Sequence, residues 1–350
     1  MKALQTPFCS RFGVRYPIVQ TGMGWVSGAR LTAATAQAGG LGFLASATMT
    51  VTALEAAIDE VQSRTTAPFG VNLRADHHDV DGVVRLIVGK GVSAASFAGA
   101  PSERLIKTLR DAGVRTLPTI GAKRHAEKMA RWGVDGLIAQ GHEGGGHTGP
   151  VPTTLLLPEV CKAVDLPVLG AGGFFDGRGL VAALAYGAAG IAMGTRFLLT
   201  QESRVPEAVK ATYLAADPRS TVVSLAVDGH PQRVLRTAFI DRLEASGPIG
   251  ALIRALRHGL AFKALTGLGL FDLLREARSM KQSQDLTWAQ VAMAANAPML
   301  TKASLVDGRL DTGILPTGQV VGVIDELPTV EALIQRIMAE AESTLSRLCP

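Results

Sequence analysis

Two histidines and a glutamate surround three consecutive glycines in segment 140–149, which reads QGHEGGGHTG. Three adjacent glycines carry a backbone entropy cost that a purely structural loop does not require. A histidine that such a loop holds over a bound ligand is suited to proton transfer near neutral pH. The alternative is a histidine that only bonds a backbone carbonyl. We favour a functional role for His147.

The same segment is a poor match to a metal site. Its spacing is H-E-x-x-x-H, whereas the helical zinc motif is H-E-x-x-H, and no third ligand stands out. We therefore predict that no metal is bound. The three cysteines (Cys9, Cys161 and Cys349) are odd in number and far apart, and neither Cys9 nor Cys161 has a neighbouring base. They are typical of reduced thiols in a cytoplasmic protein rather than of nucleophiles or disulfides.

Two glycine-rich segments, Gly170–Gly173 and Met193–Arg196, follow apolar runs that we interpret as strands. Glycine has no Cβ, so phosphate oxygens can approach backbone N–H groups closely there. The Thr195 hydroxyl can add one hydrogen bond. Each segment alone is equally consistent with a tight turn, but the pair indicates a ligand that carries a phosphate.

Gly22-Met23-Gly24 and Asn72 end two other apolar runs. The first does not fit the dinucleotide fingerprint GxGxxG, because the next glycine is Gly28, one position too late. It either packs backbone against a flat ring or forms an ordinary turn. An amide such as that of Asn72 can donate to and accept from the edge of a heterocycle. Capping of the next helix is the alternative for Asn72.

Eight short apolar runs must position these segments, and they alternate with helical patterns over the first two hundred residues. Continuous apolar runs are typical of buried parallel strands. Eight such units predict an α/β fold, a (β/α)₈ TIM barrel whose site lies at the C-terminal strand ends, with an open doubly wound sheet as the alternative. The predicted strands are 17–23, 42–47, 69–75, 94–99, 115–121, 136–141, 167–172 and 190–195. The predicted helices are 29–38, 51–63, 80–88, 102–112, 122–132, 153–164 and 177–186.

The alternation ends after Thr195, and residues 205–300 show mostly helical patterns. We predict that residues 1–204 and 311–350 form the barrel and that residues 205–310 form a mainly helical substrate or lid subdomain over its mouth. The helices predicted beyond residue 204 are 207–215, 249–262, 271–280, 288–296 and 329–348.

The chain has 350 residues, of which 47% are hydrophobic and 19% charged, and this composition excludes a disordered protein. No apolar run approaches the roughly 20 residues of a membrane span, and the N-terminus lacks a signal-peptide core. We therefore expect a cytoplasmic protein with no membrane partner. The net charge is +5, and residues 201–283 hold twelve Lys and Arg against eight Asp and Glu. No nucleic-acid motif accompanies this excess, so the anionic tail of a small molecule is the preferred interpretation.

Several stretches resemble the FMN-dependent nitronate monooxygenase and enoyl-thioester reductase family, once called 2-nitropropane dioxygenases. They span about residues 12–345 and read PIVQTGMGWVSG, AGGLGFLASA, PFGVNLRA, GHEGGGHTG, PVLGAGGFFDGRGLVAALAYGAAGIAMGTRFLLT and TGQVVGVIDELP. Others resemble the branch of flavin enoyl-CoA reductases in bacterial steroid degradation, which act on a CoA thioester left from the steroid C and D rings. These stretches are TGMGWVSGARL, LASATMT, TTLLLP, VDGHPQRVLRT and TWAQVAMAANAPML.

The resemblance implies a bound FMN and assigns residues to it. His147 matches the family's active-site histidine, and Arg74 and His142 are expected on the substrate side. The residues implied to bind FMN are Gly22, Met23, Gly24, Asn72, Gln140 and Gln319 at the flavin, Gly144, Gly145 and Gly146 along the ribityl and ring side, and Gly172, Gly173, Gly194 and Thr195 at the phosphate.

The lead hypothesis from this resemblance is an enoyl-CoA reductase. NADH or NADPH reduces FMN, the flavin N5 delivers hydride to Cβ of the unsaturated thioester, and His147 donates or positions the proton for Cα. Six Lys and Arg in 230–263, Arg233 and Arg236 among them, are expected to meet CoA phosphates, unless they form a solvated charged face. The acyl-CoA is the expected partner. The sequence does not fix the oligomeric state, and a homodimer is one assembly that it allows.

Two other readings of the resemblance stay open. In a nitronate monooxygenase the substrate itself reduces FMN, O₂ reoxidises it, and His147 acts as a base on nitroalkanes. A flavin-binding regulator would carry flavin without turnover.

Overall fold

The computed structural model describes residues 2–75, 77, 79–245 and 296–348. Nine parallel strands form one curved sheet at its centre, in the order β5-β4-β3-β2-β1-β10-β9-β7-β6. The strands are β1 (Ile18–Gln20), β2 (Leu41–Ala45), β3 (Gly70–Arg74), β4 (Ala94–Ala98), β5 (Arg115–Thr116), β6 (Thr119–Ile120), β7 (Leu137–Gln140), β9 (Val168–Ala171) and β10 (Gly190–Met193).

The two outermost strands of this sheet, β5 and β6, follow each other in the chain. Between them, the Leu117 N–H donates to the Ala95 carbonyl of β4, and the Pro118 carbonyl accepts from the Ile138 N–H of β7, each at 2.9 Å. One extended segment therefore joins both edges, and the sheet closes as the predicted TIM barrel rather than as an open sheet. The predicted strand 115–121 is divided at Pro118, which has no N–H to donate.

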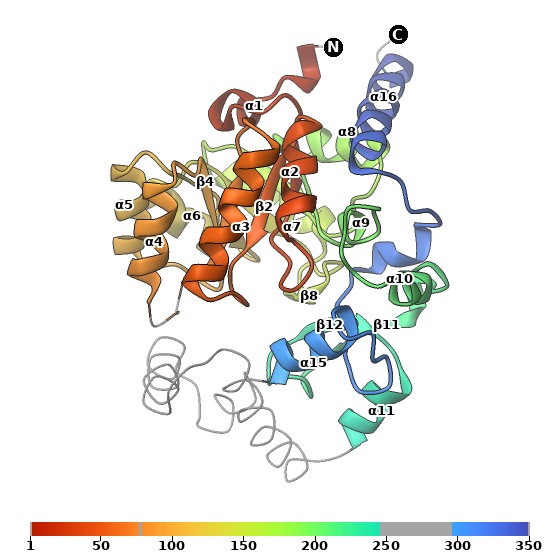
Figure 1. The fold of residues 1–350 in the computed structure, drawn as a ribbon. Coiled ribbons are helices and arrows are strands. Elements are labelled where there is room, and N and C mark those ends of the chain that lie inside the picture. Colours follow the sequence, from red (N-terminus) through yellow and green to blue (C-terminus); the bar gives the residue numbers. More distant parts are fainter. Residues whose placement is uncertain (1, 76, 78, 246–295, 349–350) are drawn as a thin grey trace.

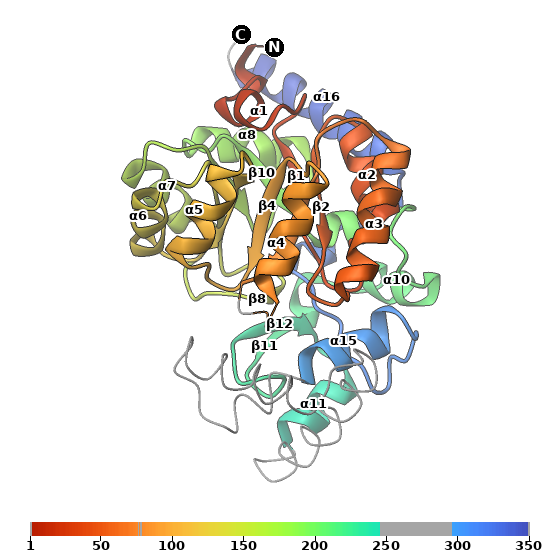
Figure 2. The ribbon, with the colours of Figure 1, turned by 60° about the vertical axis from the view of Figure 1, so that its left-hand side comes forward.

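Helices surround the barrel in both views (Figures 1 and 2). Side-chain oxygens of Thr50, Asp79, Ser102 and Asp176 each accept a backbone N–H and cap the helix that follows. The helices are α2 (Ala29–Gln37), α3 (Val51–Arg64), α4 (Val80–Gly89), α5 (Glu103–Asp111), α6 (Lys123–Arg131), α7 (Thr153–Ala163), α8 (Gly177–Ala185) and the short α9 (Thr195–Leu198). All except α9 match predicted helices. None of the described helices is long and apolar enough to cross a membrane.

The N-terminal end of the barrel is filled by α1 (Pro7–Phe12). Phe8 and Phe12 stack with ring centroids 4.6 Å apart and belong to the same buried cluster as Val19, Phe43 and Leu169 of the strands. Burial of these large side chains leaves the opposite, C-terminal end of the barrel as the place for chemistry.

The 205–310 region adds a small second sheet, which was not predicted. Strands β11 (Thr221–Ser224) and β12 (Gln232–Leu235) form an antiparallel hairpin. Strand β12 also pairs antiparallel with β8 (Gly146–His147), a two-residue strand within the glycine loop of residues 140–149. Runs of four residues give too weak a pattern to distinguish strand from helix. This sheet adds strands to a segment that was expected to be mainly helical.

The described helices of this region are α10 (Glu207–Leu214), as predicted, α11 (Ala238–Ala245) and α15 (Asn296–Leu305). The hairpin, α11 and α15 share a core of their own that includes Val234, Ile240, Leu300 and Ile314. The predicted helices 249–262 and 271–280, and 288–295 of the predicted helix 288–296, lie outside the described residues.

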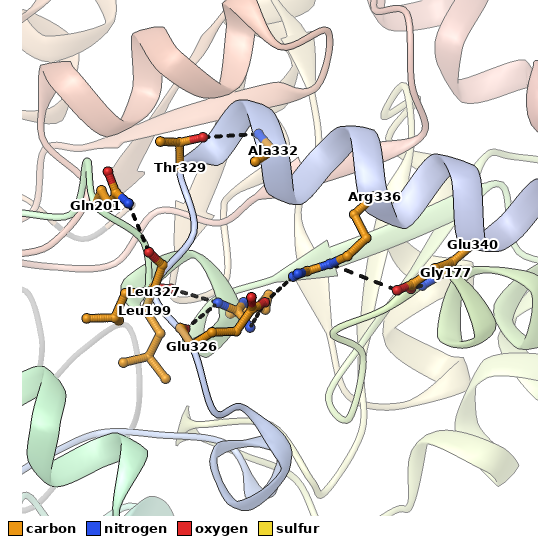
Figure 3. Close-up of polar contacts among 10 residues, drawn as sticks. Gly177, Leu199, Gln201, Glu326, Leu327, Thr329, Ala332, Arg336 and Glu340 are labelled. Carbon is orange, nitrogen blue, oxygen red and sulfur yellow. Dashed lines mark hydrogen bonds and ion pairs between the residues drawn. The ribbon is translucent and has the colours of Figure 1, made fainter.

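The chain returns to the barrel through the 3₁₀ helix η3 (Gln319–Val323) and ends in α16 (Val330–Leu348), which packs on α8 and α2. Buried Arg196, in α9, donates to the Glu326 carbonyl at 3.0 Å. Figure 3 shows the contacts that follow: Glu326 meets Arg336, and the Glu340 carboxylate accepts the Gly177 N–H. These contacts fix the return segment, residues 311–329, over the strand ends.

Candidate functional site

The glycine loop after β7 folds back over the barrel mouth. The Gln140 amide donates to the His147 carbonyl at 2.7 Å, and a Cβ on Gly144 would lie 2.7 Å from that amide nitrogen. Gly146 has a φ of +66°, a conformation that favours glycine. The three glycines therefore let the loop turn tightly enough to bring His147 back toward the barrel.

Glu143 in this loop has a structural partner. Its carboxylate accepts the Thr153 backbone N–H at 2.9 Å and the Thr153 hydroxyl at 2.8 Å, so it caps the first turn of α7. A carboxylate at a helix N-terminus is favourable because it meets the free N–H groups there. Among the described residues, no group of three or more His, Cys, Asp or Glu is placed to hold a metal ion.

The end of β1 lies directly against the end of β3. A Cβ on Gly22 would come within 2.7 Å of the Asn72 Cγ, so only glycine fits there. The Asn72 amide donates to the Ser96 hydroxyl at 2.9 Å on β4. Met23 is half-buried, and its sulfur would lie 3.5 Å from a Cβ on Gly194. The structure thus brings together the predicted residues Gly22, Met23, Asn72 and Gly194.

The ends of β9 and β10 present backbone N–H groups. Gly172 and Gly173 have φ of +95° and +86°. The N–H groups of Gly172, Gly173, Gly194 and Thr195 find no acceptor among the described residues. Four such donors at neighbouring strand ends form a cradle for an anion.

The return segment, which comes from the C-terminal part of the chain, lies against this cradle. The Gly318 N–H donates to the Thr195 hydroxyl at 2.9 Å, and the Gln319 N–H donates to the Glu143 carbonyl at 3.0 Å. A Cβ on Gly145 would lie 2.5 Å from the Gly318 nitrogen. Loop, strand end and return segment are therefore packed backbone to backbone.

The His147 ring meets a carboxylate from the other region. Its Nε2 lies 2.7 Å from Oδ2 of Asp228, whose side chain is 4% exposed, while the histidine side chain is 59% exposed. Burial acts to lower the His147 pKa, but the hydrogen bond and the negative charge of Asp228 outweigh it, so the pKa is raised. The ring of His230 lies edge-on to that of His147, with centroids 5.9 Å apart.

Four residues were predicted on the substrate side. The His142 Nδ1 lies 2.8 Å from the Gly149 carbonyl, and Arg74 lines a small pocket with Ser46 and Met49. Arg233 is buried, and its guanidinium donates to the His142 carbonyl at 3.0 Å and to the Thr221 hydroxyl at 3.0 Å.

Of the four, Arg233 departs most from expectation. Its contacts lie inside the protein, whereas the sequence analysis directed it at a CoA phosphate. Arg236 is exposed and pairs with Asp241 at 2.9 Å.

Sequence reasoning missed two residues at the site. Asp228 was quoted only within the stretch VDGHPQRVLRT, and its separation of 81 residues from His147 hid the pair. Trp25 has a φ of +66°, the only positive value for a non-glycine among the described residues. Its indole N–H donates to the Pro298 carbonyl at 2.9 Å, and its carbonyl accepts from Arg204 at 2.7 Å. A strained residue at a strand end is a signal for a site only once its φ is known.

A sequence profile of the nitronate monooxygenase family matches residues 5–84 and 78–340, nearly the whole chain. The chain belongs to the nitronate monooxygenase family. The expected family is thereby confirmed.

Two relatives in this family are similar to the chain from end to end. One, from Rhodococcus jostii, is named (3aS,4S,5R,7aS)-5-hydroxy-7a-methyl-1-oxo-octahydro-1H-indene-4-carboxyl-CoA dehydrogenase and is 56% identical over 348 residues, 99% of each chain. Its namesake from Mycobacterium tuberculosis is 54% identical and covers 97% of this chain and 96% of its own. The structure of FabK from Thermotoga maritima is 32% identical, has a TM-score of 0.79 and covers 98% of each chain. The chain is thus an oxidoreductase with the predicted fold.

Proposed function

We propose that this protein is an FMN-dependent oxidoreductase that removes two hydrogens from Cα and Cβ of an acyl-CoA. The proposed substrate is the hydroxy-oxo-octahydroindene-carboxyl-CoA for which its relatives are named. The match to those relatives over at least 96% of each chain carries the proposal. The substrate class therefore remains the expected steroid-derived CoA thioester. A cytoplasmic location of the protein, as expected from the sequence, suits a CoA-linked substrate.

The proposed direction differs from the lead hypothesis of the sequence analysis. Reduction of an enoyl-CoA was expected, whereas the relatives are named dehydrogenases. The same bond and the same protein groups serve both directions, because forward and reverse reactions share one transition state. NAD⁺ or NADP⁺ is the proposed final electron acceptor, with NADH or NADPH as donor in reverse.

The residues at the strand ends fit FMN. The four free N–H groups of Gly172, Gly173, Gly194 and Thr195 suit its phosphate. Gly22, whose missing Cβ leaves room only for the Asn72 side chain, would present flat backbone to the ring, with Met23 and Gly24 beside it. Gln140, Gly144, Gly145, Gly146 and Gln319 would hold the ribityl chain and ring from the loop and the return segment.

FMN, when bound, supplies a two-electron acceptor for the hydrogen that leaves Cβ. His147 acts as the general base for the proton on Cα. Neutral imidazole accepts a proton at a ring nitrogen with a lone pair, and a pKa near the working pH makes it effective. The exposed face of the His147 ring leaves room for the thioester to reach it.

The CoA part has candidate contacts at the rim. Arg236 is exposed at the end of β12, and its partner Asp241 is exposed as well, so a phosphate can replace that partner. Arg74 and His142 are proposed on the acyl side, where Arg74 lies at the end of β3.

The test is an anaerobic absorbance trace of the yellow holoenzyme mixed with the saturated hydroxy-oxo-octahydroindene-carboxyl-CoA. We expect bleaching of the flavin band, recolouring on addition of NAD⁺ or NADP⁺, and a product with a double bond conjugated to the thioester. A product with a ketone at the hydroxyl position instead would overturn the Cα–Cβ assignment. Protein that carries no flavin and takes none up would overturn the proposal as a whole.

Nitronate oxidation is the second candidate, because the family is named for it. In that reaction the CoA-directed residues have no role. Bleaching by a nitronate, but by neither the thioester nor NADH or NADPH, would establish it in place of the dehydrogenase.

A further inference from the structure

We infer that Asp228 is a positioning residue for His147, so that the 205–310 region completes the reactive centre instead of only covering it. This inference rests on the proposed function, in which His147 is the base. The observation that carries it is the nearly buried Asp228 carboxylate, whose Oδ2 lies within hydrogen-bond distance of the His147 imidazole.

The two oxygens of Asp228 have separate donors. Oδ2 lies 2.7 Å from the His147 Nε2, and Oδ1 accepts the backbone N–H of His230 at 3.1 Å. The side chain of Asp228 is 4% exposed, and a buried carboxylate is stable only where donors replace its water. The carboxylate therefore cannot turn away without leaving a buried charge without its partner, and the His147 ring is held in one orientation.

This orientation decides which ring nitrogen does chemistry. A carboxylate can only accept, so Nε2 carries the proton, and Nδ1 is left with the lone pair that a base requires. When Nδ1 takes the proton from Cα, the imidazolium that forms is stabilised by the negative charge beside it. The same logic operates where a buried aspartate fixes the tautomer of a catalytic histidine in hydrolases.

The hairpin fixes the backbone of His147 as well as its ring. Gln232 and Arg233 of β12 pair with His147 and Gly146 of β8, and the Thr148 N–H donates to the Pro231 carbonyl at 3.1 Å. The turn between β11 and β12 contains Asp228. One hairpin thus supplies both the strand that holds the loop and the carboxylate that orients its ring.

Other charged groups near His147 are engaged elsewhere. The Glu143 carboxylate caps α7, and the Arg233 guanidinium is bound to a carbonyl and a hydroxyl. His230, on the same turn as Asp228, is the remaining titratable neighbour among the described residues, and its ring lies edge-on to that of His147. Within the part of the chain that the structure describes, Asp228 is therefore the carboxylate that sets the protonation of His147.

The experiment compares the holoenzymes Asp228→Asn and Asp228→Glu with wild type. In Asp228→Asn we expect the rate of flavin reduction by the saturated thioester to fall at least about tenfold. Flavin content should stay unchanged, as should the thioester concentration for half-maximal rate. Asp228→Glu, which keeps the charge, should recover part of the rate. Asp307→Asn, an exposed carboxylate paired with Lys302, is the control and should behave as wild type.

The pH profile separates positioning from a merely structural role. As a base, His147 works when neutral, so the rate rises with pH through its pKa. Loss of the Asp228 charge lowers that pKa and moves this limb to lower pH. An unchanged limb in Asp228→Asn, or a rate loss explained wholly by lost flavin, would overturn the inference.

A readout without turnover distinguishes failure of the inference from failure of the proposed function. Nitrogen NMR of labelled histidine should show His147 protonated at Nε2 in wild type and a mixed tautomer in Asp228→Asn. If wild type fails to oxidise any thioester yet shows this tautomer shift, the proposed function fails and the pairing stands. A mixed tautomer already in wild type would contradict the pairing.

Discussion

The barrel rim, which consists of the C-terminal strand ends and the glycine loop that follows β7, and the hairpin of β11 and β12 contribute to the same site in different ways. The rim contributes mostly backbone: glycines at four strand ends, N–H groups without acceptors, and a loop packed against Gly318. The hairpin contributes side chains, namely the Asp228 carboxylate and the Arg233 guanidinium, both buried. His147 is the exception on the rim, since its side chain crosses to the hairpin.

The difference predicts opposite sensitivities. A site made of backbone is damaged by adding atoms, because a new Cβ has no space. A site made of side chains is damaged by removing atoms, because a buried partner is left unpaired.

The largest effect should come from the rim residue whose side chain takes part in the proposed chemistry. His147→Ala removes the base, and general-base catalysis contributes roughly 10²–10⁴-fold. We expect a loss of that order in the rate of flavin reduction by the saturated thioester, with flavin content unchanged. His125→Ala, an exposed histidine on α6, is the control. A variant as fast as wild type would remove His147 from the mechanism.

Adding one carbon to the rim should come next. Gly145→Ala places a Cβ 2.5 Å from the Gly318 nitrogen and must push the return segment away. We expect FMN affinity to fall at least about tenfold, a change of roughly 1.4 kcal/mol, measured by fluorescence titration of the apoprotein. Gly89→Ala on α4, where a Cβ meets nothing within 4 Å, should leave it unchanged. Equal affinity in both variants would show that the rim tolerates added atoms.

Thr195 is where the rim depends on a hydroxyl. Thr195→Val leaves the Gly318 N–H without its acceptor, and an unpaired buried donor costs about 1–3 kcal/mol. We expect that loss in the free energy of unfolding from urea titration, while Thr195→Ser keeps the acceptor and most of the stability. If Thr195→Ser is as unstable as Thr195→Val, packing of the methyl group is the cause.

Stability should depend on pH through the pair that joins the two regions. The folded-state pKa of His147 is raised, so the pair stabilises the folded state below the unfolded pKa, about 6.5. That contribution is lost as pH rises through the folded-state pKa. The gap in Tm between wild type and Asp228→Asn should therefore be widest in acid and narrow as pH rises. A gap that widens with pH would contradict the sign of the shift.

The smallest effect is expected at Arg236. Its exposed pair with Asp241 is worth at most about 1 kcal/mol, so Arg236→Gln should barely change Tm. As a CoA contact, however, it should raise KM for the thioester, more at low salt than at high salt. Arg219→Gln, whose side chain is 93% exposed in the same region, is the control. An unchanged KM would leave Arg236 as a surface ion pair only.

The barrel was predictable because its signals are local. Each βα unit has an apolar run, a cap or glycine and a helical pattern, so the predicted helices 51–63 and 177–186 end within a residue of α3 and α8. The closeness of Gly22 to Asn72 followed from the rule that strand ends share one rim. The division of β5 and β6 at Pro118 could have been read from the proline itself.

The pairing of His147 with Asp228 was beyond a single sequence. It depends on a hairpin of two four-residue strands that pairs with a strand of only two residues. None of these strands is long enough to show a recognisable alternation of apolar and polar residues in the sequence. The two residues in contact are also 81 positions apart. Arg233 was misdirected for a related reason: its charge indicated an anion, while only the fold shows that it is buried and bound to the His142 carbonyl.

The return segment also sets the order of events during synthesis. Residues 317–319 close over the cradle at Thr195, yet they leave the ribosome after more than nine tenths of the chain. A nascent chain can form most of its strands and helices before these residues emerge, because those contacts are made earlier along the sequence. In the proposed function, cofactor capture is then a late step, and we expect a chain cut short before residue 317 to hold a nearly complete barrel that retains FMN poorly.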